Sequence, residues 1–593
     1  MTSLDRTSSQ WRAAARGADR RGSPLRRLTG RWLVFAIAGV PLLIVLGLLA
    51  VVIWVSFLED VSGGLGGALT LRHLGTIYTD SLVWTALVNT AGFAVVTVVT
   101  AMAFGVAAAW LVERTDLPGK RLVYLLMTIG LLIPTFFQAM GWVFFMHPRI
   151  GMFNRWMMNL FGLSEGPVNI ANVFGMGWVE GLGLASLAFV MTSPILRAIN
   201  PALEEGATVH GLGRWHALRF IVLPLTWPAL LAAAIYISVI AIATFEVPAI
   251  IGMANKVFTF STLVYIKVSP ELGTPNYGIV GALSLFLVGL SILLSWWYFR
   301  VIRLSHRYGV VQGRGYRPKL IQLGRYWWLG WLGLGIYFLL SKILPLLMMI
   351  WAALLPWFQP FSIQALKFVS WRNFEMINWS LVWRGAANTL ILSLTVPTLA
   401  LVFGLAISWI VVRTRQRQRF LFDWVAFLPH AVPNLIFALA AVIVALFVLP
   451  QWLPLYGSVM ILVVVYVLVR ISLTTRVLNG ALLQIHSELE EAAHVSGISA
   501  IATLWKVIVP LLLPAMLNLW IWNALLSYRE LTMAAFMVTQ DNVTLPVVVW
   551  GFWNSGLGGQ AAAVSLVFVA TLIPLVAAYW GLRSRTGVSG VQG

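Results

Sequence analysis

The chain has 593 residues, of which 60% are hydrophobic and 10% are charged, and its formal net charge is +20. A soluble protein has roughly a quarter of its residues charged, so this composition excludes a water-soluble globular protein. The chain contains no Cys, which excludes disulfides, Cys-ligated zinc and thiol chemistry. The basic residues lie between long apolar runs and not on a solvated surface, so we expect no nucleic-acid partner.

Twelve apolar stretches are long enough to cross a lipid bilayer, because about 20 helical residues span the ~30 Å hydrocarbon core. They show no alternating strand pattern, and only helices satisfy the backbone over such runs. The sequence therefore predicts an all-α polytopic membrane protein with about 12 transmembrane helices. The expected spans are 33–57, 84–112, 122–146, 172–196, 220–252, 279–299, 327–356, 384–412, 420–449, 455–475, 507–538 and 561–582.

The distribution of Lys and Arg predicts the orientation. A basic tail (1–32) precedes the first span, and a basic linker (306–325) separates the sixth span from the seventh. When the N-terminus is placed in the cytoplasm, most of the 40 Lys and Arg fall in cytoplasmic segments, as the positive-inside rule requires. We expect a multi-pass protein of the inner (plasma) membrane, with the N-terminus and the C-terminal tail (586–593) in the cytoplasm.

The chain contains two copies of one unit. Residues 89–115 align without gaps with 388–414, and the matches include Asn, Gly, Trp and Arg. Residues 203–225 align in the same way with 489–511. We expect two tandem six-helix halves, 33–305 and 326–585, related by a pseudo-twofold axis along the membrane normal. Such symmetry places a transport pathway at the interface of the halves.

Each half carries a similar charged loop between its fourth and fifth spans, at 200–219 and 486–506. Ser487 followed by Glu490 predicts a capping box, and Asn200 with Pro201 starts the equivalent helix. The Gly of each loop can take the positive φ that ends one short helix and turns the chain into the next. The recurring residues are Glu204, Glu205, Gly206, Ala207, Gly211 and Pro224 in the first half, and Glu490, Glu491, Ala492, Ala493, Gly497 and Pro510 in the second.

These loops resemble the EAA motif in the permease subunits of binding-protein-dependent ATP-binding-cassette (ABC) importers, and the similarity extends over both halves. Gly206 departs from the family pattern, which usually has Ala, at a cost of about 1 kcal/mol in helix propensity. The resemblance implies the type I permease fold. It also implies that each loop docks on a cytoplasmic ATPase subunit, so that two copies bind, with Glu205 and Glu491 as anchors and Gly211 and Gly497 setting the bend.

The sequence contains no G-x-x-x-x-G-K-[ST] phosphate loop and no catalytic or metal-ligand constellation. We therefore expect a transport subunit that is not an enzyme, with no catalytic residues, no metal site and no cofactor of its own. The resemblance implies that ATP and Mg are bound by the partner ATPase. It also implies that a periplasmic or lipid-anchored solute-binding protein delivers the cargo.

Among the charged residues within predicted spans, Glu246 in the fifth, and Arg529 and Glu530 in the eleventh, are candidates for a functional role. A charge near the bilayer centre costs about 2.5–3.5 kcal/mol on insertion scales, so such residues face partners or a cavity. They either line the pathway or its gate, or form a structural salt bridge. Lys342, in the seventh span, is expected to snorkel or pair on a peripheral helix.

The cargo is less clearly marked. The fusion of two halves, and the stretches 148–175 and 245–265, resemble the ferric-iron type of the family, and less closely the thiamine type. Ferric iron is the expected solute, with thiamine, polyamine, phosphonate or another small solute as alternatives. An ion-driven secondary transporter is the alternative of a different class, but it would not need paired docking loops.

Overall fold

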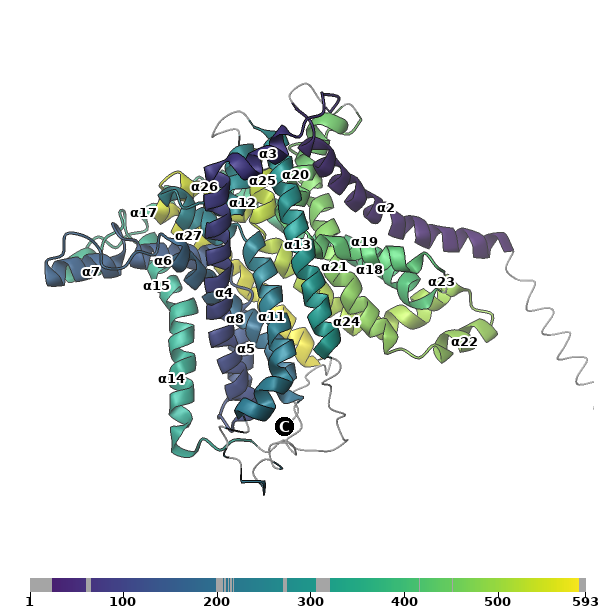
Figure 1. Cartoon of the computed structure of the whole chain (residues 1–593), viewed down its shortest axis with the longest axis horizontal. Coiled ribbons are helices and arrows are strands. Elements are labelled where there is room, and N and C mark those ends of the chain that lie inside the picture. Colours follow the sequence, from purple (N-terminus) through teal and green to yellow (C-terminus); the bar gives the residue numbers. More distant parts are fainter. Residues whose placement is uncertain are drawn as a thin grey trace, which may run out of the picture.

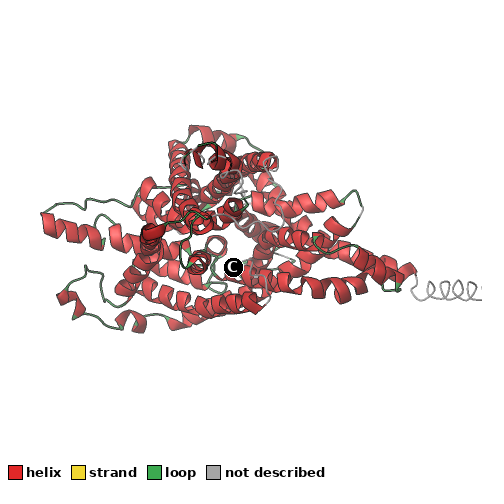
Figure 2. Ribbon diagram, turned by 90° about the horizontal axis from the view of Figure 1, so that it is seen from below, coloured by secondary structure: helices red, strands yellow, loops and turns green. Residues whose placement is uncertain are grey.

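The computed structural model describes residues 24–585, except 60–64, 199–205, 207–208, 212, 214–215, 217, 270–274, 306–319, 415 and 451. Within this part of the chain every regular element is a helix, and pairing between extended segments is limited to two isolated β-bridges (Figure 2). The expectation of an all-α fold is confirmed.

The first half begins with α2 (Pro24–Ser56) and ends with α13 (Tyr277–Ser305). Between them lie α3 (Arg72–Thr79), α4 (Ser81–Arg114), α5 (Lys120–Gly130), α6 (Thr135–Met146), α7 (Met152–Phe161), α8 (Val173–Arg197), the π-helix η1 (Leu218–Val222), α11 (Leu223–Ala243), η2 (Pro248–Gly252), η3 (Met253–Asn255) and α12 (Phe260–Val268).

The second half begins with η6 (Gly324–Tyr326) and ends with α27 (Gly558–Arg585). Between them lie α14 (Trp327–Phe338), η7 (Leu339–Ile343), α15 (Leu344–Ala353), α16 (Ile363–Leu366), α17 (Arg372–Glu375), α18 (Trp379–Arg413), α19 (Arg419–Ala431), α20 (Asn434–Ile443), η8 (Val444–Val448), α21 (Val459–Leu483), α22 (Glu488–Val495), α23 (Ala500–Thr503), η9 (Leu504–Ile508), α24 (Val509–Tyr528), α25 (Thr532–Met537) and α26 (Leu545–Asn554).

The internal repeat is confirmed at the level of helix bounds. α8 and α21 begin and end at positions related by the sequence offset of the second aligned block, and η1 and η9 do the same. The close approach of α4 to α8 also recurs, because a Cβ at Gly105 would lie 2.5 Å from Ala188 Cβ, and one at Gly404 would lie 2.5 Å from Thr474 Cγ2. The two halves are therefore copies in packing as well as in sequence.

The spans differ from expectation at their breaks. Nine described helices are long and apolar enough to cross a membrane, or up to 12 if each of three bent pairs counts as one span. Straight helices were expected over 122–146 and 420–449, but α5–α6 bends by 93° and α19–α20 by 99°. Pro134 and Pro433 precede α6 and α20, and a residue before Pro is forced out of the α conformation, which explains both breaks.

Two further spans end earlier than expected. The helix expected over 220–252 stops at Ala243, and a short bent pair (Pro248–Asn255 and Phe260–Val268, 72°) follows it. The helix expected over 507–538 stops at Tyr528, before the short α25. Glu246, Arg529 and Glu530 therefore lie at helix breaks and not within continuous spans, which corrects the sequence-based placement.

The first helix of each half also packs on the other half. α2 contacts α13 of its own half and α18, α19 and α20 of the second, while α15 contacts α6 of the first half and α27 of its own. α2 extends away from the bundle on the right of Figure 1.

Lys342, in η7 before α15, donates from Nζ to the Gly130 carbonyl at 2.8 Å, so it pairs within the protein and does not snorkel.

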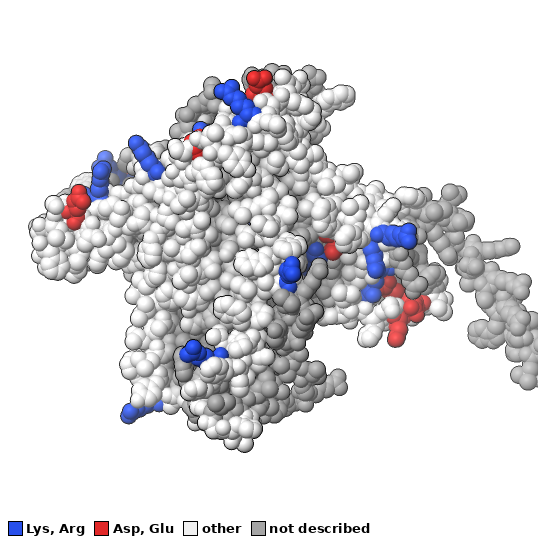
Figure 3. Space-filling view, in the orientation of Figure 1, with Lys and Arg blue, Asp and Glu red and all other residues white. Residues whose placement is uncertain are grey.

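The surface of the helices is largely apolar. Most of the face in Figure 3 carries no Lys, Arg, Asp or Glu from the described residues. On α4, Val88, Val95 and Val99 are exposed and recur at helical spacing. Exposed apolar stripes on long helices fit contact with lipid, since bilayer chains are as apolar as these side chains.

Candidate functional site

The loop of the second half forms a sharp elbow. α22 ends at Val495, and Gly497 has φ +76°. The N–H of Ile498 donates to the Ala493 carbonyl at 2.9 Å, the bond that defines a Schellman end. In the first half Gly211 has φ +80°. The predicted positive φ is confirmed at both glycines.

Each elbow joins a long helix through a π-helical turn. η1 leads into α11 and η9 leads into α24, and Pro224 and Pro510 lie in the first turn of those helices. Pro has no N–H to donate and its ring crowds the preceding turn, so a widened turn just before it relieves the clash. Because the backbone is helical from η9 into α24, a displacement of the elbow is passed to the long helix.

Arg413 at the end of α18 holds the second elbow in place. Its Nε lies 2.8 Å from Glu490 Oε1, and its Nη2 donates to the carbonyls of Leu482 at 2.9 Å and Ile485 at 2.7 Å. Burial raises the pKa of the Glu490 carboxyl, and the Arg413 guanidinium opposes that rise. The carboxylate expected to close a capping box with Ser487 is instead paired with Arg413, because the half-buried end of α18 offers a charged partner.

α22 leaves a mixed surface exposed. Glu491 and Ala492 are exposed, whereas Ala493 is buried against the protein. Val495 is 89% exposed, and Val209, at the same place in the repeat, is 84% exposed. Sequence reasoning missed this pair, although each Val stands two residues before the Gly of its elbow.

Part of the first elbow, which corresponds to α22, lies outside the described residues. Glu204, Glu205 and Ala207, together with Asn200 and Pro201, lie outside the described residues. Gly206 is described, and its carbonyl accepts a bond from the His210 N–H at 3.1 Å.

A cavity of about 1290 Å³ lies between the halves. Its lining includes Leu187 of α8 and Leu473 of α21, which are equivalent in the repeat. One end reaches Arg121 and Arg197, at the ends of α5 and α8 on the elbow side. The other end reaches the helix breaks at Glu246 and Glu530.

Glu246 and Arg529, at the cavity end with the helix breaks, bind the ends of α6 and α5. Glu246 Oε2 accepts bonds from Thr135 Oγ1 at 2.6 Å and from the Phe136 N–H at 3.3 Å, at the start of α6. Arg529, from the second half, donates to the Leu131 carbonyl at 2.7 Å, at the end of α5. A carboxylate at a helix N-terminus and a cation at a C-terminus both match the helix dipole. The break between α5 and α6 is thus stabilised by charges.

Glu530 belongs to a second group of contacts. Its Oε2 lies 3.1 Å from Arg470 Nη2, and its Oε1 accepts from the Met533 N–H at 3.3 Å, in the first turn of α25. Glu246, Arg529 and Glu530 all line the cavity, and each also has a structural bond. Sequence reasoning missed Arg470 and Glu180, each of which was visible as a single charge within an apolar run.

Aromatic side chains close the cavity beyond the charges. Phe245 packs on Tyr265 of its own half at 5.2 Å between ring centroids, and on Phe536 and Trp550 of the second half at 5.6 and 5.8 Å. Phe245, Phe536 and Trp550 are buried. The cavity therefore extends toward the elbows and ends at this inter-half cluster.

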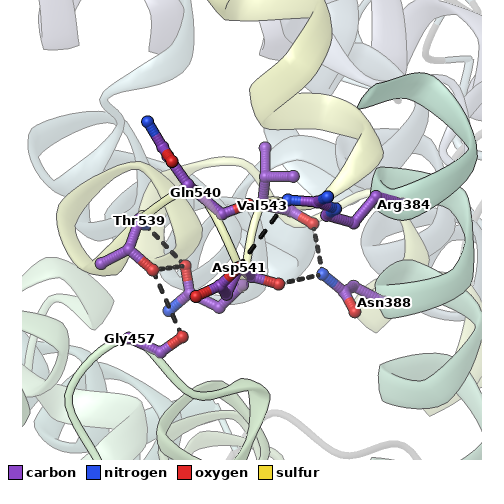
Figure 4. Close-up of polar contacts among 8 residues, drawn as sticks. Arg384, Asn388, Gly457, Thr539, Gln540, Asp541 and Val543 are labelled. Atoms are coloured by element: carbon purple, nitrogen blue, oxygen red, sulfur yellow. Dashed lines mark hydrogen bonds and ion pairs between the residues drawn. The ribbon is translucent and has the colours of Figure 1, made fainter. Parts of the chain in front are cut away.

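Hydrogen bonds from α18 and to Gly457 hold the loop between α25 and α26, on the side of the bundle where the aromatic cluster lies. Asn388 Nδ2 donates to the carbonyls of Asp541 and Val543, both at 2.9 Å, and Thr539 Oγ1 donates to Gly457 at 3.2 Å (Figure 4). Asn89, equivalent to Asn388, donates to Phe258 at 2.9 Å. The Asn pair noticed in the repeat thus holds an equivalent loop in each half.

Metal and catalytic groups were not expected. Within the described part of the chain, no group of three or more His, Cys, Asp or Glu is placed to hold a metal ion. Glu246, Arg529 and Glu530 at the cavity end are engaged in helix capping or an ion pair, whereas Glu180 has one oxygen without a partner.

Several transport permease proteins are similar to this chain over most of its length or over one part of it. The ferric transport system permease protein FbpB of Actinobacillus pleuropneumoniae is 21% identical over 85% of this chain and 72% of its own length. The Fe(3+)-transport system permease protein FbpB 2 of Haemophilus influenzae is 22% identical over 82% and 87%. The molybdenum transport system permease protein ModB of Escherichia coli (strain K12) is 25% identical, over 37% of this chain and 95% of its own length.

The family described as the inner membrane component of binding-protein-dependent transport systems matches twice, at residues 101–305 and 400–583. These matches fall one in each half and include both elbows and the helices that line the cavity. The chain is therefore a member of this family of ABC transport permeases, in a form that joins two permease halves.

Proposed function

We propose that the chain forms the pathway of an ATP-driven importer for ferric iron. Two cytoplasmic ATPase subunits dock on the two elbows, and a binding protein delivers the solute to the opposite side. The observation that carries this proposal is the pair of exposed valines, Val209 and Val495, on elbows that continue into the cavity-lining helices α11 and α24.

The geometry supports a coupling role in two steps. An exposed apolar side chain next to small residues can enter a groove on a partner, where its burial is worth about 1.5–3 kcal/mol. In the second half the backbone is helical from α23 through η9 into α24, so the elbow is connected directly to a wall of the cavity. A movement of both ATPase subunits would therefore rock the two halves and change which side of the membrane the cavity faces.

The ion-driven alternative makes a different demand on the molecule. A secondary transporter has no use for an apolar residue repeated on two elbows at the membrane surface. Shifting a two-state equilibrium from 1:99 to 99:1 takes about 5.5 kcal/mol, which the binding of nucleotide to two attached subunits can supply.

Cargo assignment rests on the relatives. Two relatives that match over most of the chain are named for ferric iron transport. The molybdenum permease matches only 37% of the chain. The inside orientation of the elbows and of both termini is part of the same proposal, because the ATPase and the positive charge must share one side of the membrane.

The docking role is tested with Val209→Asp and Val495→Asp, singly and together. We expect the double variant to lose co-purification of the ATPase and uptake of solute, while membrane insertion is unchanged, because a carboxylate would be buried in an apolar groove. Leu453→Asp is the control, since it adds the same charge at an exposed position in the loop before α21. Full ATPase retention in the double variant would contradict the proposal.

The cargo is tested by loading proteoliposomes with the complete complex and its binding protein. Iron uptake that depends on ATP supports the assignment. Uptake of molybdate, thiamine, a polyamine or a phosphonate in place of iron would replace it.

A further inference from the structure

We propose that Glu180 and Glu246 form an oxygen-ligand site for a hard metal cation at the closed end of the cavity, where the cargo stops briefly. This inference rests on the proposed function, since the cation is the transported ion. It assigns a role to Glu180, which neither helix capping nor an ion pair explains.

Glu180 is a buried carboxylate with an unused oxygen. It lies in α8, it is 2% exposed, and it contributes to the cavity wall. Its Oε1 accepts from Thr244 Oγ1 at 3.2 Å, but its Oε2 has no hydrogen-bond partner. A buried carboxylate oxygen without a partner is costly, so it indicates a ligand that the site is built to receive.

A second unpartnered group lies on α6, opposite Gly183, which is about one turn beyond Glu180 in α8. Gln138 of α6 is 1% exposed, and neither atom of its amide has a partner. A Cβ at Gly183 would lie 3.1 Å from Gln138 Oε1 and 3.0 Å from Thr135 Cγ2, so α8 and the start of α6 meet here. Thr135 in turn donates to Glu246, which joins the two carboxylates to one wall.

The cations near this wall have other partners. In the described part of the chain, neither Glu180 nor Glu246 forms an ion pair with Lys or Arg. Arg470 pairs with Glu530, Arg529 donates to Leu131, and Lys342 donates to Gly130. Two carboxyl groups inside the membrane with no ion-pair partner among the described residues offer oxygen ligands to a mobile cation.

The available ligands select the kind of ion. Glu180, Glu246, Thr135 and Gln138 supply carboxylate, hydroxyl and amide oxygens, which suit hard cations, whereas softer metals prefer His and Cys ligands. Two carboxylates also fall short of the larger cluster that holds a resident metal. A site of this strength fits an ion in transit, because conduction requires that the ion can leave.

The site belongs to the first half alone. The position in α21 that corresponds to Glu180 is Tyr466, whose hydroxyl donates to the Glu530 carbonyl at 3.4 Å. Arg470, one turn further along α21, is paired with the carboxylate of Glu530. A cation entering the cavity would therefore be held against the first half.

The test uses the purified permease–ATPase complex in nanodiscs, without nucleotide, and equilibrium dialysis against Ga³⁺ supplied as its nitrilotriacetate complex. Glu180→Gln keeps the shape and the acceptor for Thr244 but removes the charge. We expect affinity for Ga³⁺ to fall by at least about tenfold, as the loss of a ligand-supporting group commonly does. Glu180→Asp keeps the carboxylate and should retain part of the binding.

Glu113→Gln is the matched control, because Glu113 is paired with Arg197 at 3.0 Å near the opposite end of the cavity. Size-exclusion chromatography with the ATPase shows that each variant is assembled. Equal Ga³⁺ binding by the unchanged protein and Glu180→Gln would overturn the site, even if the complex still imports iron. Binding that depends on Glu180 in a complex that imports no metal would support the site and overturn iron as the cargo.

Discussion

α8 and α21 have the same length and the same place in the two halves, yet they present different side chains to the cavity. α8 contributes Glu180, with one oxygen unpartnered, whereas α21 contributes Arg470, already paired with Glu530. The elbows differ less, since both have a positive-φ Gly and an exposed Val. The repeat is therefore kept at the elbows, where the proposed coupling needs two equal contacts, whereas the side chains of the cavity wall differ between the halves.

The largest effect on transport is expected from loss of Arg413, the charged side chain that contacts the second elbow. Arg413→Ala leaves Glu490 without its cation and frees two carbonyls. Breaking a fully buried pair costs about 3–5 kcal/mol, which is the upper bound for this half-buried pair. ATP hydrolysis should continue without solute uptake, measured in proteoliposomes. Arg114, its counterpart, is 4% exposed and should be at least as sensitive. Coupled transport in Arg413→Ala would show that the elbow does not depend on α18.

A smaller effect separates the two helix crossings. Gly105→Ala would place a Cβ 2.6 Å from the Ala185 carbonyl oxygen, a backbone atom, whereas Gly404→Ala meets side-chain atoms of Thr474 and Leu478. Overpacking costs about 1–3 kcal/mol, and a side chain relaxes more easily than backbone. Thermal unfolding of the complex in detergent should therefore occur at a lower temperature for Gly105→Ala than for Gly404→Ala. The reverse order would contradict the packing described for α4 and α8.

The smallest effects are expected at the loops beside the aromatic closure. Asn388→Ala removes two hydrogen bonds, one of them buried, at about 1–3 kcal/mol, and Asn89→Ala removes one that is partly buried, so Asn388→Ala should destabilise more. Arg384→Ala should change stability by less than about 1 kcal/mol, because its pair with Asp541 spans 3.8 Å and both side chains are exposed. Chemical denaturation of the complex measures all three. A larger loss of stability for Arg384→Ala than for Asn388→Ala would contradict this ranking.

Much of this architecture could be predicted from the sequence, because its signals are local. Apolar run length predicts the spans, and the matched Glu, Gly and Pro residues predict the elbows and the positive φ at Gly211 and Gly497. The roles of Glu205 and Glu491 in docking remain predictions. Their physical basis is a contact with another subunit, which the fold of this chain alone does not contain.

Other features depend on contacts between distant segments. Pro134 and Pro433 signalled breaks within apolar runs, but hydropathy alone favours continuous helices there. Nothing local to Glu490 indicates that Arg413 replaces Ser487 as its partner, or that Arg529 reaches the end of α5 in the other half. Glu180 becomes significant only when its unpartnered oxygen is seen beside Gln138 and Glu246.

The most direct test of alternating access uses the absence of Cys from the chain. Leu187→Cys and Leu473→Cys place one thiol at equivalent points of the cavity wall, one in each half. In vesicles with the elbows facing outward, both thiols should react with a membrane-impermeant maleimide when nucleotide is absent, and both should be protected when the ATPase is trapped with ATP and vanadate. Equal labelling in the two states, or protection in one half alone, would contradict a cavity that closes by the joint movement of two elbows.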